Sequence, residues 1–167
     1  MLSVNALQDM LAYTAWASRR LLDAAAQLTP DQLMRDFGTS DKSVLGTLVH
    51  VFAADRIWFH RIQGTSPQKF VSEDEYRLSV LENDWPALHE QWRQWAAGLD
   101  DATAASDLEY RDMSGRPWRQ PIWQIVIHVV NHGTHHRGQA QGFLRAMGVA
   151  PPPLDMSFYY RTRAASA

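Results

Sequence analysis

The chain has 167 residues, a formal net charge of -2, seven His, seven Trp and no Cys. Its length suits one domain with a sizeable core, so we expect a single domain over residues 1–167. The absence of Cys excludes disulfides, Cys-ligated metals and a thiolate nucleophile from the chain. The balanced charge argues against nucleic-acid binding, no apolar run is long enough to span a membrane, and the N-terminal residues do not resemble a signal peptide. We therefore expect a cytoplasmic protein that acts on a small molecule.

The N-terminal half predicts two long helices. Apolar residues at helical spacing mark the first over about residues 3–27, with Ser3 as its N-cap. The sequence TPDQ at residues 29–32 combines a cap, a Pro at the first helical position and a capping-box Gln, so it predicts a short helical turn. The second long helix covers about residues 43–63 and is apolar on nearly all sides, which predicts burial on two sides.

The C-terminal half predicts two further helices and a small hairpin. Helical spacing returns over residues 72–99, which we interpret as one helix; a break is an alternative, because Asn83 or Asp84 could cap a new start before Pro86. Residues 107–120 alternate around Ser114 and Gly115, a pattern typical of a short β-hairpin. The last helix is expected over residues 121–147. Four long helices joined by polar loops predict an all-α helical bundle.

Four of the seven His gather in one segment of the last helix, HVVNHGTHHRGQ. His128, His132 and His136 follow one another at intervals of four residues, which places neighbours on one helical face. On a wheel of about 100° per residue, His132 and His136 fall on the apolar arc, while His128 and His135 fall on its flank. The pair His132 and His136 is therefore predicted to face the bundle interior, where it could reach one metal ion.

A third metal ligand must be His, Asp or Glu, because the chain has no Cys. His50 is the leading candidate, since it lies in the middle of the most buried helix beside the small residues Ala53 and Ala54. His60 lies near a helix end and His89 lies on a more polar helix, so both rank lower. Three neutral imidazoles and a water would make an open site of the catalytic kind, whereas the alternative is a set of hydrogen-bonded core His.

Other side chains near these positions are candidates for supporting roles. Gln139 could orient a ligand imidazole, with packing or capping as the alternative. Arg137 is expected at the surface or an interface, and Asp55 and Arg56 are expected to form a structural ion pair. Tyr159 and Tyr160 are further candidates for the mouth of the site. No residue is singled out as a general acid or base.

The chain resembles the DinB/YfiT-like family of proposed metalloenzymes. The resemblance rests on AYTAWASRRLL near the start, SVLGTLVHVFAADRIWFHRIQG at residues 43–64, NHGTHHRGQ at residues 131–139 and PPPLD near the end. The segments appear in the expected order over nearly the whole chain. The resemblance implies a four-helix bundle in up-down-down-up order, commonly dimeric, with a divalent metal held by His50, His132 and His136.

The resemblance indicates the metal ligands, but it leaves several reactions open. Related members include bacillithiol S-transferases and a mycothiol-dependent maleylpyruvate isomerase, while others are assigned only as damage-inducible or as hydrolases. Our first hypothesis is a metal-dependent transferase that joins a low-molecular-weight thiol cosubstrate to a small electrophile. The second is a hydrolase of a small ester or amide, and the third is a non-enzymatic, stress-related protein that binds metal or a ligand. We favour zinc or nickel, with iron or manganese as alternatives.

Overall fold

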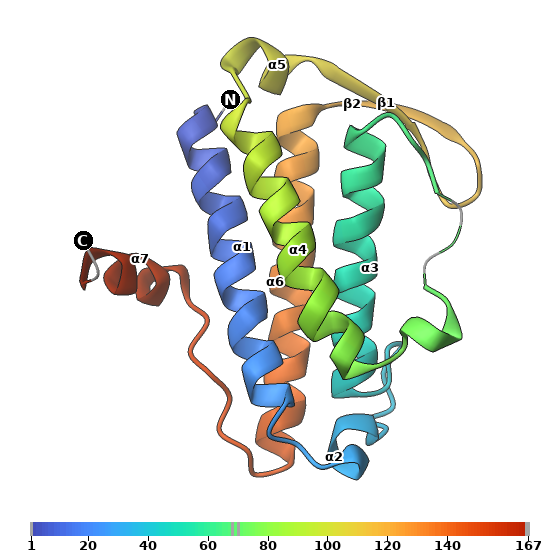
Figure 1. The fold of residues 1–167 in the computed structure, drawn as a ribbon, viewed down its shortest axis with the longest axis vertical. Helices are drawn as coiled ribbons and strands as arrows, with labels where there is room; N and C mark the ends of the chain where they lie inside the picture. Colours follow the sequence, from blue (N-terminus) through green and yellow to red (C-terminus); the bar gives the residue numbers. More distant parts are fainter. Residues whose placement is uncertain (1, 68, 70, 166–167) are drawn as a thin grey trace.

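The structure is a computed structural model that describes residues 2–67, 69 and 71–165. Four long helices lie side by side as a bundle (Figure 1): α1 (Val4–Ala25), α3 (Val44–Ile62), α4 (Leu78–Ala97) and α6 (Ile122–Ala146). In Figure 1, α1 and α6 run down the page, whereas α3 and α4 run up it. The all-α bundle with up-down-down-up order is therefore confirmed.

Shorter elements join the long helices. The hairpin pairs Tyr110 with Trp118 in an antiparallel register and lies beyond the ends of α3 and α6 (Figure 1). The described short elements are α2 (Pro30–Met34), the 3-10 helix η1 (Glu73–Glu75), α5 (Asp101–Ala105), β1 (Asp107–Arg111), β2 (Pro117–Pro121) and α7 (Met156–Ala165).

Polar caps fix where several helices begin. The Ser3 side chain accepts from the Ala6 amide at the start of α1, and Thr29 forms a capping box with Gln32 at α2. Ser43 caps α3 by accepting from the Gly46 amide at 3.0 Å. These caps confirm the predicted helix starts, and the last one fixes the direction in which the loop before α3 approaches the bundle.

Helix α4 continues through Pro86, so a break at this residue is not found. The interruption instead separates η1 from α4 at residues 76–77. Pro86 lacks the N–H that would bond the carbonyl of Glu82, but Glu82 is exposed, so water can satisfy that carbonyl. Trp85 and Trp92 are buried on the inner side and hold the helix against the bundle.

The C-terminal helix α7 packs against α1. The ring of Tyr159 lies 5.8 Å from that of Tyr13 and 5.6 Å from that of Trp16, between ring centres. Arg163 forms an ion pair with Asp9 of α1 at 2.6 Å. Tyr159 thus belongs to the packing of α7 on α1, and its predicted place at the mouth of the His site is wrong.

Helix α6 is buried against two neighbours, α3 on one side and α1 on the other. Its buried residues include Val129 and Ala140, and Arg137 between them. Within the described residues, no helix combines the length and the apolar character that crossing a membrane requires. The pairing of α3 with α6 brings the N-terminal part of α3 beside the middle of α6, and this is where the candidate site lies.

Candidate metal site

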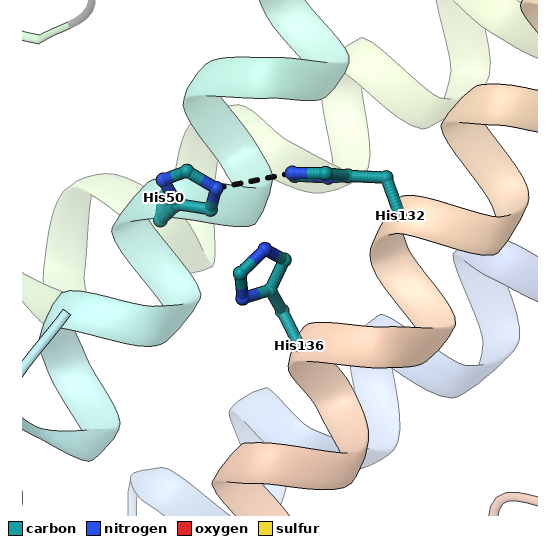
Figure 2. A group of neighbouring side chains, drawn as sticks. All are labelled: His50, His132 and His136. Carbon is teal, nitrogen blue, oxygen red and sulfur yellow. Dashed lines mark hydrogen bonds between the residues drawn. The ribbon is translucent and has the colours of Figure 1, made fainter. Parts of the chain in front are cut away.

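Three His from two helices meet between α3 and α6. His50 lies on α3, His132 and His136 lie on α6, and one ring nitrogen of each falls within 4.8 Å of the others. Figure 2 shows the three rings turned toward a common centre, with Nε2 of His50 at 3.0 Å from Nε2 of His132. Imidazole nitrogens at such spacing could hold a metal ion. His60, the lower-ranked candidate on α3, is exposed near the end of that helix and lies outside this group.

Burial favours neutral rings at this site. Desolvation, together with the nearby rings of His136 and His50, lowers the pKa of His132 to about 4. Desolvation also lowers the pKa of His50, although the Asp41 carboxylate opposes that shift. Neutral imidazoles keep their lone pairs, so the rings are ready to bind a cation near neutral pH without first losing protons.

Gln139 orients one ring of the site. Its carbonyl oxygen Oε1 lies 2.7 Å from Nδ1 of His136, on the same helix. A carbonyl oxygen can only accept, so Nδ1 carries the proton and Nε2 of His136 keeps its lone pair. The contact matches the orienting role predicted for Gln139, since hydrogen bonds of this kind fix the tautomer of ligand imidazoles.

Asp41 lies behind two of the three rings and was missed by the sequence analysis. One carboxylate oxygen is 3.6 Å from Nδ1 of His50, and the other is 3.4 Å from Nδ1 of His136. Its side chain is only 16% exposed. Asp41 belongs to the loop before α3, so no helical spacing relates it to the His, and its nearness depends on how that loop folds.

Aromatic residues continue the wall of the site beyond His132. The ring centre of His128 is 5.8 Å from that of His132, and Trp58 lies 5.1 Å from His128. Tyr110 of the hairpin meets Trp58 edge-on at 5.0 Å. Both His128 and His135 are exposed, as the helical wheel predicted for the flank of α6. An aromatic surface therefore leads from the three His toward the hairpin.

A second cluster contains His89 on α4. His89 Nε2 lies 3.5 Å from Asp55 Oδ2, and the same oxygen accepts from the Trp85 indole N–H at 2.9 Å. The predicted ion pair between Asp55 and Arg56 is wrong, because Arg56 pairs with Glu75 of η1 instead. Asp55 points into the bundle and Arg56 points outward, so these adjacent side chains lie on different faces of α3 and have different partners.

Arg137 is buried, so its predicted surface position is wrong. Only 1% of the residue is exposed, and its guanidinium bonds Ser18 of α1 at 3.3 Å and Thr134 at 3.2 Å. A Cβ at Gly133 would lie 2.6 Å from the Arg137 guanidinium, so glycine leaves room for it. Desolvation lowers the pKa of Arg137, opposed in part by Asp55. The wheel assumed one buried arc on α6, whereas α1 buries a second.

Comparison with known proteins places the chain in a family. A family model described as the DinB family matches residues 1–165. The chain belongs to the DinB family. It is 22% identical over 155 residues to the protein DinB of Bacillus subtilis (strain 168), covering 88% of this chain and 89% of that protein. It is also 24% identical over 140 residues to the uncharacterized protein YizA of the same organism, covering 81% and 83% of the two chains.

A solved structure agrees with the fold. The crystal structure of a DinB-like protein from Bacillus cereus superposes with a TM-score of 0.64 at 17% identity, over 90% of this chain and 97% of that one. At this identity the likeness supports the bundle architecture alone. The candidate site therefore rests on the residues of this chain, in which three His that the sequence singled out lie together.

Proposed function

We propose that this DinB-family protein is a divalent-metal-dependent enzyme whose ligands are His50, His132 and His136. The observation that supports the proposal is the convergence of three ring nitrogens within 4.8 Å, two of them on His50 and His132, whose pKa burial lowers. Three protein ligands leave one coordination position for a small molecule, as in catalytic sites. We favour zinc or nickel, with iron or manganese as alternatives, because imidazole is a common ligand of zinc, nickel and iron, whereas manganese prefers oxygen ligands.

The reaction that we propose is S-transfer from a low-molecular-weight thiol to a small electrophile. A divalent metal at three neutral His supplies positive charge that stabilises a thiolate, or lowers the pKa of a bound water. The chain has no Cys, so the reacting sulfur must arrive with a cosubstrate. The thiol releases its proton to the solvent, the sulfur bonds to the electrophilic carbon, and the bond from that carbon to the leaving group breaks, so that the leaving group departs with the electron pair.

The charges around the site support an anionic ligand. Burial lowers the pKa of His50 and of His132, which favours their neutral forms, and Asp41 supplies one negative charge beside His50 and His136. A divalent cation would retain about one positive charge after this compensation, and a thiolate would balance it. The side chain of His50 is 27% exposed, so a small molecule can approach the site from solvent.

The aromatic surface beyond His132 is the place that we propose for the electrophile. His128 and Trp58 follow His132 in ring contact, and Arg61 lies over the Trp58 ring at 4.4 Å. Flat apolar rings favour an organic substrate, and they would hold its reacting carbon near the position open to the thiol. As the resemblance to the family implies, we also propose a homodimer, which light scattering of the purified protein tests. We further propose a cytoplasmic location, which cell fractionation tests.

A turnover screen tests the proposed reaction. The protein is loaded with zinc, nickel or manganese and assayed for conjugation of monochlorobimane with several thiols, beside generic ester substrates. Thiol-dependent turnover should disappear in His50→Ala and persist in His135→Ala, a matched control because His135 is exposed on α6. Ester turnover without thiol would replace the transferase proposal with a hydrolase, and bound metal without turnover in either assay would favour a binding protein.

A further inference from the structure

The position of Asp41 connects two of the three His that we propose as metal ligands. Its two carboxylate oxygens face different rings, at 3.6 Å from Nδ1 of His50 and 3.4 Å from Nδ1 of His136. Both contacts are made to the nitrogen on the far side of the ring from Nε2. One carboxylate thus approaches a ring on α3 and a ring on α6, and no other carboxylate among the described contacts of this kind approaches both.

The loop that carries Asp41 is closely fitted to the start of α3. A Cβ at Gly46 would overlap the carbonyl oxygen of Asp41, so only glycine lets the loop pass this close to the first turn of the helix. The Ser43 amide donates to the same carbonyl at 2.7 Å. Lys42 takes a φ of 61°, which turns the chain sharply between Asp41 and α3.

The other end of the loop is also anchored. The Phe37 amide donates to the Lys42 carbonyl at 2.8 Å, and the Phe37 ring stacks on that of Phe143 of α6 at 4.4 Å with an interplanar angle of 4°. The loop therefore contacts both helices that carry the His. A backbone held at both ends and at Gly46 places the Asp41 carboxylate with little freedom.

We propose that Asp41 is a positioning residue for the metal site. The negative charge of its carboxylate favours the Nδ1–H tautomer of His50 and, together with the hydrogen bond from His136 to Gln139, that of His136, so that Nε2 of each ring faces the shared metal position. Carboxylates in this relation to ligand imidazoles orient the rings and raise their basicity. This inference rests on the proposed metal-binding function and deepens it, since it names the residue that selects the binding tautomer and supplies negative charge to the site.

The test compares Asp41→Asn with Asp36→Asn. Asn retains the shape of Asp41 but removes its charge and one acceptor oxygen. Asp36 is exposed in the same loop, and its oxygen accepts from the Gly38 amide, a bond that Asn can also make. Zinc affinity, measured by competition with a chelator, should fall about 10- to 100-fold in Asp41→Asn and stay unchanged in Asp36→Asn. Equal affinity in Asp41→Asn and the wild type would overturn the inference while leaving the proposed function intact.

A second measurement needs neither metal nor a variant. Nitrogen-15 NMR of the His rings in the metal-free wild type should show His50 with its proton on Nδ1, and a proton on Nε2 would overturn the inference. The Gly46→Ala variant should reproduce the loss of zinc affinity, because the added Cβ displaces Asp41. If the wild type bound no metal at all, the proposed function would fail, and the NMR result would still decide whether Asp41 sets the tautomer.

Discussion

Two clusters in this bundle each combine His with Asp, yet they differ in what the ring nitrogens face. In the cluster between α3 and α6, His50, His132 and His136 turn nitrogens toward one another, and Asp41 lies behind two of the rings. In the cluster between α3 and α4, the Nε2 of His89 turns toward Asp55, a single carboxylate. The three-His cluster therefore offers several ring nitrogens to one cation, whereas in the second cluster the ring nitrogen of His89 faces a buried carboxylate.

The two clusters also differ in access. The side chains of His89 and Asp55 are 10% and 2% exposed, whereas that of His50 is 27% exposed. The Asp55 carboxylate accepts from the Trp85 indole, and its charge acts on the buried Arg137. We interpret the second cluster as a structural polar layer. Both clusters contain His and Asp, so it is the direction of the ring nitrogens that distinguishes the candidate metal site from the structural cluster.

We expect the strongest effect on zinc affinity, which should depend on the three-His cluster and not on His89. Replacing His132 with Ala removes a proposed metal ligand. Loss of a group that only orients a ligand typically costs about 10- to 100-fold in metal affinity, so the loss of a ligand itself should lower zinc affinity by more than about 100-fold. Replacing His89 with Ala should leave zinc affinity unchanged. Chelator competition on both variants checks the pair. Similar losses in both would mean that the clusters do not differ in the way described.

The second prediction tests the structural role of Asp55. Replacing it with Ala leaves the Trp85 indole N–H without its acceptor and Arg137 without a nearby buried anion. The free energy of unfolding should fall by about 3 kcal/mol. Urea unfolding of the metal-free protein measures the change. Zinc affinity should be retained, and a variant with normal stability but lost zinc binding would assign Asp55 to the metal site instead.

The third prediction concerns the space that Gly133 leaves for Arg137. An Ala at position 133 would put its Cβ 2.6 Å from a guanidinium that is buried and has little room to move, so the free energy of unfolding should fall by about 1–2 kcal/mol. Gly138→Ala is the matched control on α6, because nothing lies within 4 Å of its added Cβ. The control should gain up to about 1 kcal/mol from helix propensity. Thermal unfolding of both variants checks the opposite signs, and a stabilised Gly133→Ala would contradict them.

The smallest expected effect is a pH dependence of the metal-free protein. The pKa of His132 is lowered from 6.5 to about 4, so above pH 6.5 the ring is neutral in both folded and unfolded chains. As the pH falls below 6.5, the unfolded chain takes up a proton that the folded one does not. The free energy of unfolding should therefore decline between pH 6.5 and 5, by on the order of 1 kcal/mol given the partial exposure of the ring.

Denaturant unfolding in the presence of a chelator measures that decline. The matched variant is His132→Gln, which keeps a polar side chain and cannot titrate in this range. Its free energy of unfolding should change less than that of the wild type between pH 6.5 and 5. An equal slope in the two proteins would show that His132 does not carry the predicted effect.

Much of the fold could be predicted from sequence because it depends on local signals. Helical spacing and the caps at Ser3 and Thr29 indicated the helices, and alternation around Ser114 and Gly115 indicated the hairpin. The alternative of a break before Pro86 is not found, because the outcome depended on tertiary packing, with the unpaired carbonyl on the exposed side of α4.

In the candidate site, too, some residues could be predicted from local sequence patterns and others depend on tertiary packing. The interval from His132 to His136 and the apolar surroundings of His50 are visible in sequence, and the structure brings the three together. Asp41 comes from a loop whose path depends on the missing side chain of Gly46, and no periodicity relates it to the His. The burial of Arg137 depends on a second helix packing on α6, which a wheel with one apolar arc does not represent.

X-ray absorption at the zinc edge of the wild-type protein, loaded with one equivalent of zinc, tests the three-His site most directly. We expect one tightly bound ion per chain, with three imidazole nitrogens at about 2.0–2.1 Å and one further light atom. Loading of His135→Ala should give the same spectrum. A spectrum without imidazole scattering, or one that is unchanged in His50→Ala, would contradict the three-His metal site.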